Sequence, residues 1–287
     1  MKKKHKKWKE KKWELGFLLP SLIGVGVFFV VPFGVIFYYS MVDSPIDPRF
    51  VFLRNFVNLF HNSAFLQAAK NTAVFSLTAV PLAVLLSIIL EQNIPLRSTF
   101  RTFFLTPLMV PTASIVLIWQ VFFHYNGAIN QFLVHLGAGK IDWFKSSFSQ
   151  IIVLLLFLWK NLGYNMILFL AALNDIPREY MEVADLDGAS AWQKFIYIKI
   201  RYLSPTILFV AIMSLINSFK VFREVYLLTG DYPYDTLYML QHFMNNTFKA
   251  LDYQKLSAAA IIMCSVMVVI IGLLFVVENH FGKDVEG

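Results

Sequence analysis

The sequence contains few charged residues and almost no cysteine. Charged side chains make up 15% of its 287 residues, whereas soluble domains contain about 25%. The single cysteine, Cys264, lies in an apolar run, so neither a disulfide framework nor a cysteine metal site can form within the chain. The sequence also lacks a glycine-rich phosphate loop followed by Lys and Ser or Thr, which excludes an ATPase of that class.

What the sequence has instead is apolar residues in long runs, since hydrophobic residues make up 57% of the chain. An apolar run of about 18 residues or more is typical of a membrane span. We therefore predict an all-α polytopic membrane protein with about six transmembrane helices in one membrane domain, residues 15–277. The predicted spans cover residues 15–39, 69–90, 103–123, 150–173, 205–221 and 257–277. Prolines at positions 20, 32, 81, 107 and 111 predict bent helices.

The formal net charge of +7 comes almost entirely from eight lysines between Lys2 and Lys12. A basic tail directly before an apolar run is a topology signal and a contact for anionic lipids, so we do not expect nucleic acid as a partner. With Lys160 left inside its span, fifteen Lys and Arg residues fall on the side of the tail and nine on the other side. Both termini are therefore predicted to be cytoplasmic, with residues 1–14 and 278–287 as tails. Residues 174–204 form a cytoplasmic loop under this topology.

That loop has the pattern of two short helices joined by a glycine. Asp175 is expected to cap the first helix, and Gly188 offers a left-handed exit from it. Ser190 and Gln193 have the spacing of a capping box, which opens a second helix that Pro205 is expected to end. The second helix is amphipathic, and this pattern fits either a helix lying on lipid headgroups or a knob that enters a partner's groove.

The loop resembles the EAA coupling loop of binding-protein-dependent ABC importers over residues 172–195, ALNDIPREYMEVADLDGASAWQKF. The resemblance implies that a separate nucleotide-binding subunit receives the loop, at Glu182, Ala184, Asp187, Gly188 and Phe195. Two positions differ from the family pattern: Val183 replaces its second alanine and Arg201 replaces its usual proline.

Further segments resemble the carbohydrate-type permeases related to the maltose and glycerol-3-phosphate systems. They are Leu19-Pro20 with Pro32 and Tyr39-Ser40, FRTFFLTP at 100–107, Ile118-Trp119-Gln120, GAIN at 127–130, and YLLTGDYP at 226–233 followed by Thr236. The last segment departs from the family's glycine run at Asp231 and Tyr232.

The resemblance implies the type I transmembrane architecture of ABC importers and a non-catalytic subunit in a bacterial or archaeal cytoplasmic membrane. It implies a sugar or oligosaccharide as solute, taken up by alternating access. The implied partners are a second homologous permease that forms a heterodimer with this chain, ATP-binding cassette ATPase subunits that hold the ATP and Mg, and an extracytoplasmic solute-binding protein. No cofactor is expected in this chain.

Polar residues inside the predicted spans are candidates for the solute path, because each needs a wet or paired location. Lys160 with Tyr164, and Asn161 with Asn165, are four residues apart and share helix faces. The full candidate set is Trp119, Gln120, Lys160, Asn161, Tyr164, Asn165, Ser214 and Asn217. Asn and Ser also join helices to one another, and Lys160 can pair with an acidic neighbour. Glu224, with Lys220 and Arg223, is interpreted as a solvated helix end.

Two other functions fit parts of the sequence. Asp185 and Asp187 match the Asp-x-Asp motif of sugar-nucleotide transferases, so a polytopic membrane glycosyltransferase is an alternative. A membrane scaffold or an ungated channel would account for the spans but not for the cytoplasmic helix pair.

Overall fold

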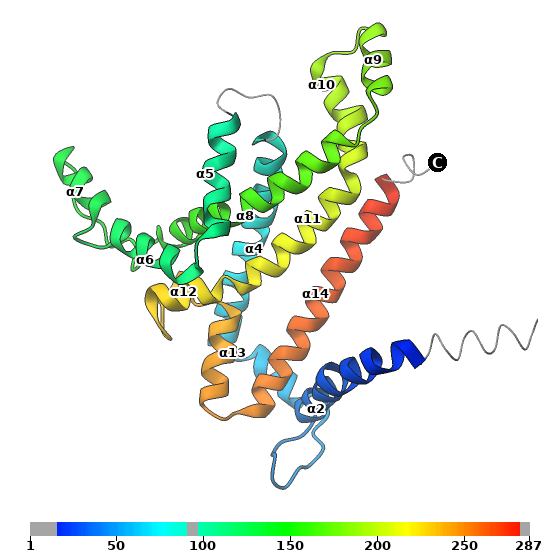
Figure 1. Ribbon diagram of the computed structural model, residues 1–287. Coiled ribbons are helices and arrows are strands. Elements are labelled where there is room, and N and C mark those ends of the chain that lie inside the picture. The colour runs from blue at the N-terminus through cyan, green and yellow to red at the C-terminus, as the bar shows by residue number, and fades with distance from the viewer. Residues whose placement is uncertain (1–15, 91–96, 282–287) are drawn as a thin grey trace, which may run out of the picture. The chain divides into compact units, whose positions relative to one another are not determined.

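The computed structural model describes residues 16–90 and 97–281, and in these ranges the chain is built from helices. It has no strand there, and the pairing between extended segments is one isolated bridge from Val42 to Phe50. Figure 1 shows the arrangement of the helices. The first half of the chain holds η1 (Gly26–Val30), α2 (Val31–Ser40), α3 (Arg54–Phe60), α4 (Ser63–Leu90), α5 (Arg97–Met109), α6 (Thr112–Phe123) and α7 (Ala128–His135). The second half holds α8 (Ser149–Asn174), α9 (Arg178–Leu186), α10 (Ala191–Lys194), η2 (Phe195–Lys199), α11 (Ile200–Lys220), α12 (Phe222–Thr229), η3 (Asp235–Leu237), α13 (Leu240–Lys249) and α14 (Tyr253–Phe281).

The all-α polytopic fold predicted from the sequence is confirmed. Within residues 16–90 and 97–281, five helices are long and apolar enough to cross a membrane, or six if one sharply bent pair counts as a single span. Four of them match predicted spans with modest extensions, namely Gly16–Ser40, Ser63–Leu90, Ser149–Asn174 and Tyr253–His280. The predicted basic tail, residues 1–14, and the last residues of the predicted C-terminal tail lie outside the described residues. Residues 278–281 of that tail continue α14.

The third predicted span, residues 103–123, is not a single helix, and the bend that Pro111 predicts is confirmed. The chain forms a broken pair instead, because Ser98–Met109 and the helical segment from Thr112 meet at an angle of 115°. Pro111 lies at the break with extended backbone (ψ 140°) and acts as the N-cap of α6. A proline removes a backbone donor and cannot continue the preceding helix without strain, which explains why the break falls there.

The fifth span is longer than predicted, and the expectation that Pro205 ends the loop's second helix is wrong. Helical structure runs from Ala191 to Thr229, and Pro205 lies inside α11. The π-helical turn η2 lies in this stretch, at Phe195–Lys199. A transmembrane helix tolerates proline when neighbouring groups and local changes of helix geometry satisfy the freed carbonyls. The second helix of the loop and the fifth span are therefore one helical rod.

The described residues fall into two compact units. One unit contains residues up to Asn62 together with 247–265. In it the Asn55 side chain donates to the carbonyls of Ser40 and Val42, at 3.0 and 2.8 Å, which ties the segment after α2 to the start of α3. The apolar side chains of the Gly16–Ser40 helix are largely exposed, as expected for a span that faces lipid or another chain.

The larger unit contains, of the described residues, 63–90, 97–246 and 266–281. Its core is made by α4, α8 and α11, with α5 against α8. Small buried residues line α4, since Ala79, Ala83 and Ser87 have no exposed surface. Small side chains let transmembrane helices approach closely. Close approach increases the dispersion contacts between them, which hold helices together in lipid, where there is no hydrophobic driving force for association. Larger side chains fill the remaining space, among them Phe75 and Phe157, whose rings meet edge to face at 5.6 Å.

Gly163 lies where α8 approaches α5 closely. A Cβ atom at this position would lie 2.1 Å from the carbonyl oxygen of Phe104, and backbone cannot move aside as a flexible side chain can. Glycine is therefore required by space at this position, since its backbone is ordinary α-helix.

His242 is buried at the start of α13, with 1% of its surface exposed. Its Nδ1 accepts a hydrogen bond from the Met239 amide at 3.2 Å, and its ring meets Phe222 edge to face at 4.6 Å. Burial lowers the pKa of His242 from 6.5 to about 4, and the charge of Asp231 opposes this shift in part.

We predict that Gly163→Ala pushes α5 away from α8 and lowers the thermal stability of the detergent-purified protein. The cost of such overpacking is about 1–3 kcal/mol. Gly272→Ala is the matched control, because it is also helical and has nothing within 4 Å of the added methyl group. Equal melting temperatures for the two variants would contradict the close packing of α5 on α8.

A second prediction concerns acid. The folded protein keeps His242 neutral while the unfolded chain protonates it, so this residue's contribution is present above pH 6.5 and is lost as the pH falls toward 4. The loss from this residue at pH 5 is about 2 kcal/mol. His242→Asn keeps an acceptor near the Met239 amide but cannot be protonated. Melting temperatures at pH 7.5 and 5.0 should therefore differ less in the variant than in the wild type, and an equal difference would contradict the prediction.

Candidate functional site

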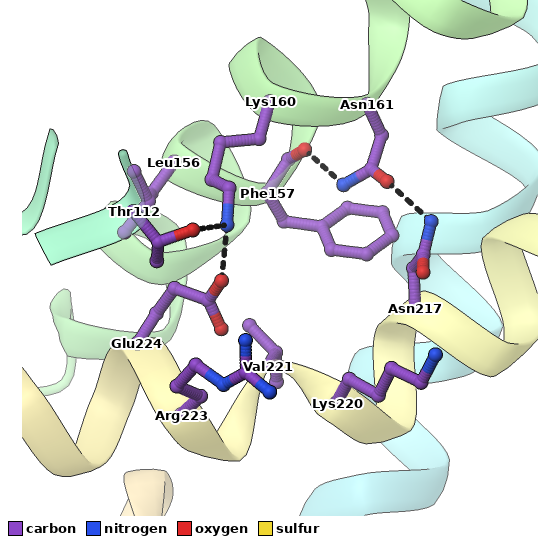
Figure 2. Close-up of a pocket in the computed structure, with 10 residues that line it drawn as sticks. All are labelled: Thr112, Leu156, Phe157, Lys160, Asn161, Asn217, Lys220, Val221, Arg223 and Glu224. Carbon is purple, nitrogen blue, oxygen red and sulfur yellow. Dashed lines mark hydrogen bonds and ion pairs between the residues drawn. The ribbon is translucent and has the colours of Figure 1, made fainter. Parts of the chain in front are cut away.

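A cavity of about 300 Å³ lies where α8, the start of α6 and the junction of α11 with α12 meet. Figure 2 shows the side chains around it. Its lining combines apolar and polar residues, and charge is concentrated in it: Thr112, Leu156, Phe157, Lys160, Asn161, Asn217, Lys220, Val221, Arg223 and Glu224.

The ion pair between Lys160 and Glu224 joins α8 to α12 at one side of the cavity. Lys160 also donates to the hydroxyl of Thr112 at 3.3 Å, which adds the start of α6 to the same contact. The two charged side chains are 20% and 11% exposed, so neither is solvated as a surface residue would be. Each charge therefore depends on the other, because an unpaired charge at this degree of burial is costly.

The position of Lys160 on α8 gives the depth of the cavity. At 1.5 Å per residue, the 26 residues of α8 span about 39 Å, and Lys160 lies about 17 Å from the N-terminal end. A span of this length crosses the roughly 30 Å hydrocarbon core, so the cavity is near the middle of the membrane.

Beside the ion pair, the amide side chains of Asn161 and Asn217 also line the cavity. Asn217 on α11 donates to Oδ1 of Asn161 on α8 at 2.8 Å, and Asn161 donates to the carbonyl of Phe157 at 2.7 Å. Deeper in the same interface, Asn165 donates to Ser214 at 3.2 Å, and both residues are almost completely buried. The structure thus brings Lys160, Asn161 and Asn217 to the cavity, and it places Asn165 and Ser214 in a contact that holds α8 to α11.

The other three candidates for the solute path lie outside the cavity lining. Trp119 stacks on Trp159 with ring centroids 5.3 Å apart and donates to the carbonyl of Ile152 at 3.3 Å. Gln120 donates to the carbonyl of Leu227 at 3.1 Å, so its amide is used in packing α6 on α12. Tyr164 is 39% exposed and is not among the residues that line the cavity.

The interpretation of Glu224 as a solvated helix end is wrong, because 8% of its surface is exposed and it pairs with Lys160. The sequence gives no direct signal for this pair, since the two residues are 64 positions apart. One sequence signal was available: the apolar run 225–228 directly follows Glu224, which favours a span that continues past it. A carboxylate within a span needs a counter-ion, and Lys160 was the candidate.

The α9–α10 hairpin is at one end of the larger unit, beyond the ends of α8 and α11 (Figure 1). Gly188 has a φ of +71°, and the side chains of Ser190 and Gln193 form the predicted capping box. Lys194 pairs with Asp185 across the turn at 2.5 Å. These bonds make the hairpin a defined structure rather than an irregular loop.

One local prediction for the hairpin is wrong. Pro177 is the N-cap of α9, and Asp175 instead ends α8 as its C-cap. Glu179 does lie in the first turn of α9, where a carboxylate complements the helix dipole. Large apolar side chains remain exposed on the hairpin, with Leu186 at 88% and Trp192 at 70%.

Comparison with known proteins assigns this arrangement to a family. The family model described as the binding-protein-dependent transport system inner membrane component matches residues 79–286. The match includes both the cavity and the hairpin.

Individual relatives are similar over most of the chain. The lactose transport system permease protein LacF of Rhizobium radiobacter is 29% identical over 274 residues, covering 90% of this chain and 91% of the relative. The sn-glycerol-3-phosphate transport system permease protein UgpA of Yersinia enterocolitica is 30% identical over 266 residues, covering 89% of each. A chain from the crystal structure of a bacterial ABC transporter that imports the acidic polysaccharide alginate has the same fold, with a TM-score of 0.79 and 24% identity. It covers 98% of this chain and all of that chain.

We predict that Glu224→Gln destabilises the protein, because it leaves the charge of Lys160 partly buried without a counter-ion. The expected cost is about 3 kcal/mol. Adding Lys160→Met to Glu224→Gln should restore much of the lost stability, since neither charge then remains. Melting temperatures of the wild type, both single variants and the double variant measure this coupling. Additive effects of the two substitutions would contradict it.

Proposed function

The chain belongs to the family of binding-protein-dependent transport system inner membrane components, and we propose that it is the permease subunit of an ATP-driven importer. The solute we propose is a sugar or oligosaccharide. The observation that carries the proposal is the family match over residues 79–286, because it includes both the midplane cavity and the hairpin. The permease would lie in the cytoplasmic membrane of a bacterium or archaeon, with both termini in the cytoplasm.

The names of the relatives support this solute class without fixing its charge. One is named for lactose, a neutral sugar, and another for sn-glycerol-3-phosphate, an anion. The words "binding-protein-dependent" in the family description support a solute-binding protein as a partner. We further propose a second permease, which pairs with this chain, and ATPase subunits that hold ATP and Mg.

We propose that the α9–α10 hairpin is the contact with the ATPase, through Glu182, Ala184, Asp187, Gly188 and Phe195. Two features support this role. The hairpin exposes large apolar side chains at its tip, which a groove on a partner can cover. Its second helix is also continuous with α11, which ends at the cavity, so a displacement of the hairpin moves cavity residues directly.

The mechanism we propose is alternating access. Closure of the ATPase subunits on ATP would draw the hairpins of both permeases together and rock the helix bundles, opening the cavity toward the binding protein. Hydrolysis would return the bundles to the inward-facing arrangement. Asn161 and Asn217 would contact the solute, and Lys160 would hold Glu224 at the wall of the cavity. Asn165 and Ser214 would keep α8 and α11 moving as one body.

The alternative of a membrane glycosyltransferase that uses Asp185 and Asp187 gains no support from the geometry. The carboxylate of Asp185 is held by Lys194, and in the described residues no group of three or more His, Cys, Asp or Glu side chains could hold a metal ion.

We predict that Gly188→Val reduces both ATP-driven solute uptake and the ATPase activity stimulated by the binding protein. The left-handed backbone at Gly188 costs a branched side chain about 1–2 kcal/mol, and relief of that strain would distort the hairpin. Both activities are to be measured on the complete complex in proteoliposomes.

Gly137→Val is the matched control, because Gly137 also has positive φ (+80°) and open space around it, but follows α7. It should keep both activities. If Gly188→Val and Gly137→Val behave alike, the hairpin is not the coupling element.

A further inference from the structure

The residues that line the cavity carry more positive than negative charge. Three cations line it, namely Lys160, Lys220 and Arg223, and the one anion in the lining is Glu224. Glu224 is taken by Lys160. Lys220 and Arg223 make no ion pair or hydrogen bond through their side chains with any residue in 16–90 or 97–281. The lining therefore has a net charge of about +2.

Two free cations at this depth need an explanation. Lys220 ends α11 and Arg223 lies in the first turn of α12, three residues later. Both border a cavity that Lys160 places near the middle of the membrane. A cation at the bilayer centre costs about 2.5–3.5 kcal/mol on insertion scales, and such residues mark solute or ion pathways when they face a water-filled cavity. Both side chains are exposed in this chain, so they face open space rather than its core.

The same cavity offers neutral hydrogen-bonding groups suited to hydroxyls. The side-chain oxygen of Asn217 accepts no hydrogen bond from the described part of the chain, and the amide keeps a second N–H after donating to Asn161. The apolar faces of Leu156, Phe157 and Val221 complete the lining. A solute that satisfies both parts combines hydroxyl groups with an acidic group.

We propose that the solute is an anionic saccharide, bearing a carboxylate, phosphate or sulfonate that Lys220 and Arg223 bind while Asn161 and Asn217 contact its hydroxyls. This rests on the proposed function and narrows its substrate class. The guanidinium of Arg223 can hold such an oxyanion through two parallel hydrogen bonds, and Lys220 adds a point charge beside it. The Lys160–Glu224 pair would remain the structural contact, because Lys160 already has its counter-ion.

A second source of negative charge has to be separated from this one. An acidic side chain of the paired permease could neutralise Lys220 and Arg223 in the assembled importer. The first experiment therefore measures the potential of the cavity in the complete complex, with no solute bound.

The probe is a thiol introduced by Asn217→Cys in a Cys264→Ser background. Its rates of reaction with an anionic and a cationic methanethiosulfonate (sulfonatoethyl and trimethylammonioethyl) are compared with those of 2-mercaptoethanol in solution. We expect the anionic reagent to be favoured at least about tenfold relative to 2-mercaptoethanol. Lys220→Gln with Arg223→Gln should remove most of that preference. If, with Lys220 and Arg223 both present, the ratio of the anionic to the cationic reaction rate equals that of 2-mercaptoethanol, the proposal is overturned.

The second experiment measures ATP-driven uptake into proteoliposomes that contain the whole importer with its binding protein. The solutes are matched pairs that differ by one carboxylate: glucose and glucuronate, galactose and galacturonate, and the corresponding disaccharides. We expect transport of an acidic member, with a KM that rises at least about tenfold in the Lys220→Gln, Arg223→Gln variant. Lys70→Gln with Lys145→Gln, which removes two exposed charges outside the cavity, is the control and should leave the KM unchanged.

The outcomes separate this proposal from the one it rests on. Uptake of the neutral members with no preference for the acidic ones would overturn the anionic class and leave the importer in place. Absence of ATP-driven uptake for every saccharide, together with no stimulation of ATP hydrolysis by the binding protein, would overturn the importer itself.

Discussion

The ion pair between Lys160 and Glu224 is the interaction on which the centre of the protein depends. It joins α8 to α12, and through Thr112 it includes the first residue of α6. On an exposed surface such a pair would contribute little, but at the burial of Lys160 and Glu224 either charge without the other is costly. The pair thus fixes α12 against α8, and the walls of the cavity follow from that placement.

The local structure of the hairpin could be predicted from the sequence, because its determinants are neighbours in the chain. Gly188 supplies the left-handed turn, and Ser190 and Gln193 satisfy each other's backbone donors within four residues. Asp175 was assigned to the wrong helix, since a residue between two helices can end one or begin the other. Of two prolines, Pro205 was misread as a helix end and Pro111 was correctly expected to bend the chain. Pro205 continues a helix and Pro111 breaks one, and the outcome depends on whether neighbouring helices satisfy the freed carbonyls.

The cavity could be predicted only in part. Lys160, Asn161 and Asn217 stand out as polar residues in apolar runs, and all three line it. Trp119 and Gln120 stand out equally but are used for helix packing, because side-chain direction depends on how α6 leaves the break at Pro111. Glu224 was assigned to solvent because hydropathy ends the fifth span before it, whereas the helix continues. Pairing between residues far apart in sequence is the information that a single sequence lacks.

The helix runs without a break from α10 through η2 into α11, and this continuity has a mechanical consequence. From Ala191 to Lys220 the chain is helical over 30 residues, about 45 Å, and a rod of this kind transmits rotation rather than absorbing it. A tilt of about 10° around its midpoint displaces each end by about 4 Å, in opposite directions. The π-helical turn at Phe195–Lys199 lies close to the hairpin end of this helix. If the helix bends at this turn, the part that moves as a rigid rod is only slightly shorter. A tilt that leaves the hairpin's own structure unchanged is therefore large enough to move Lys220 and alter the lining of the cavity.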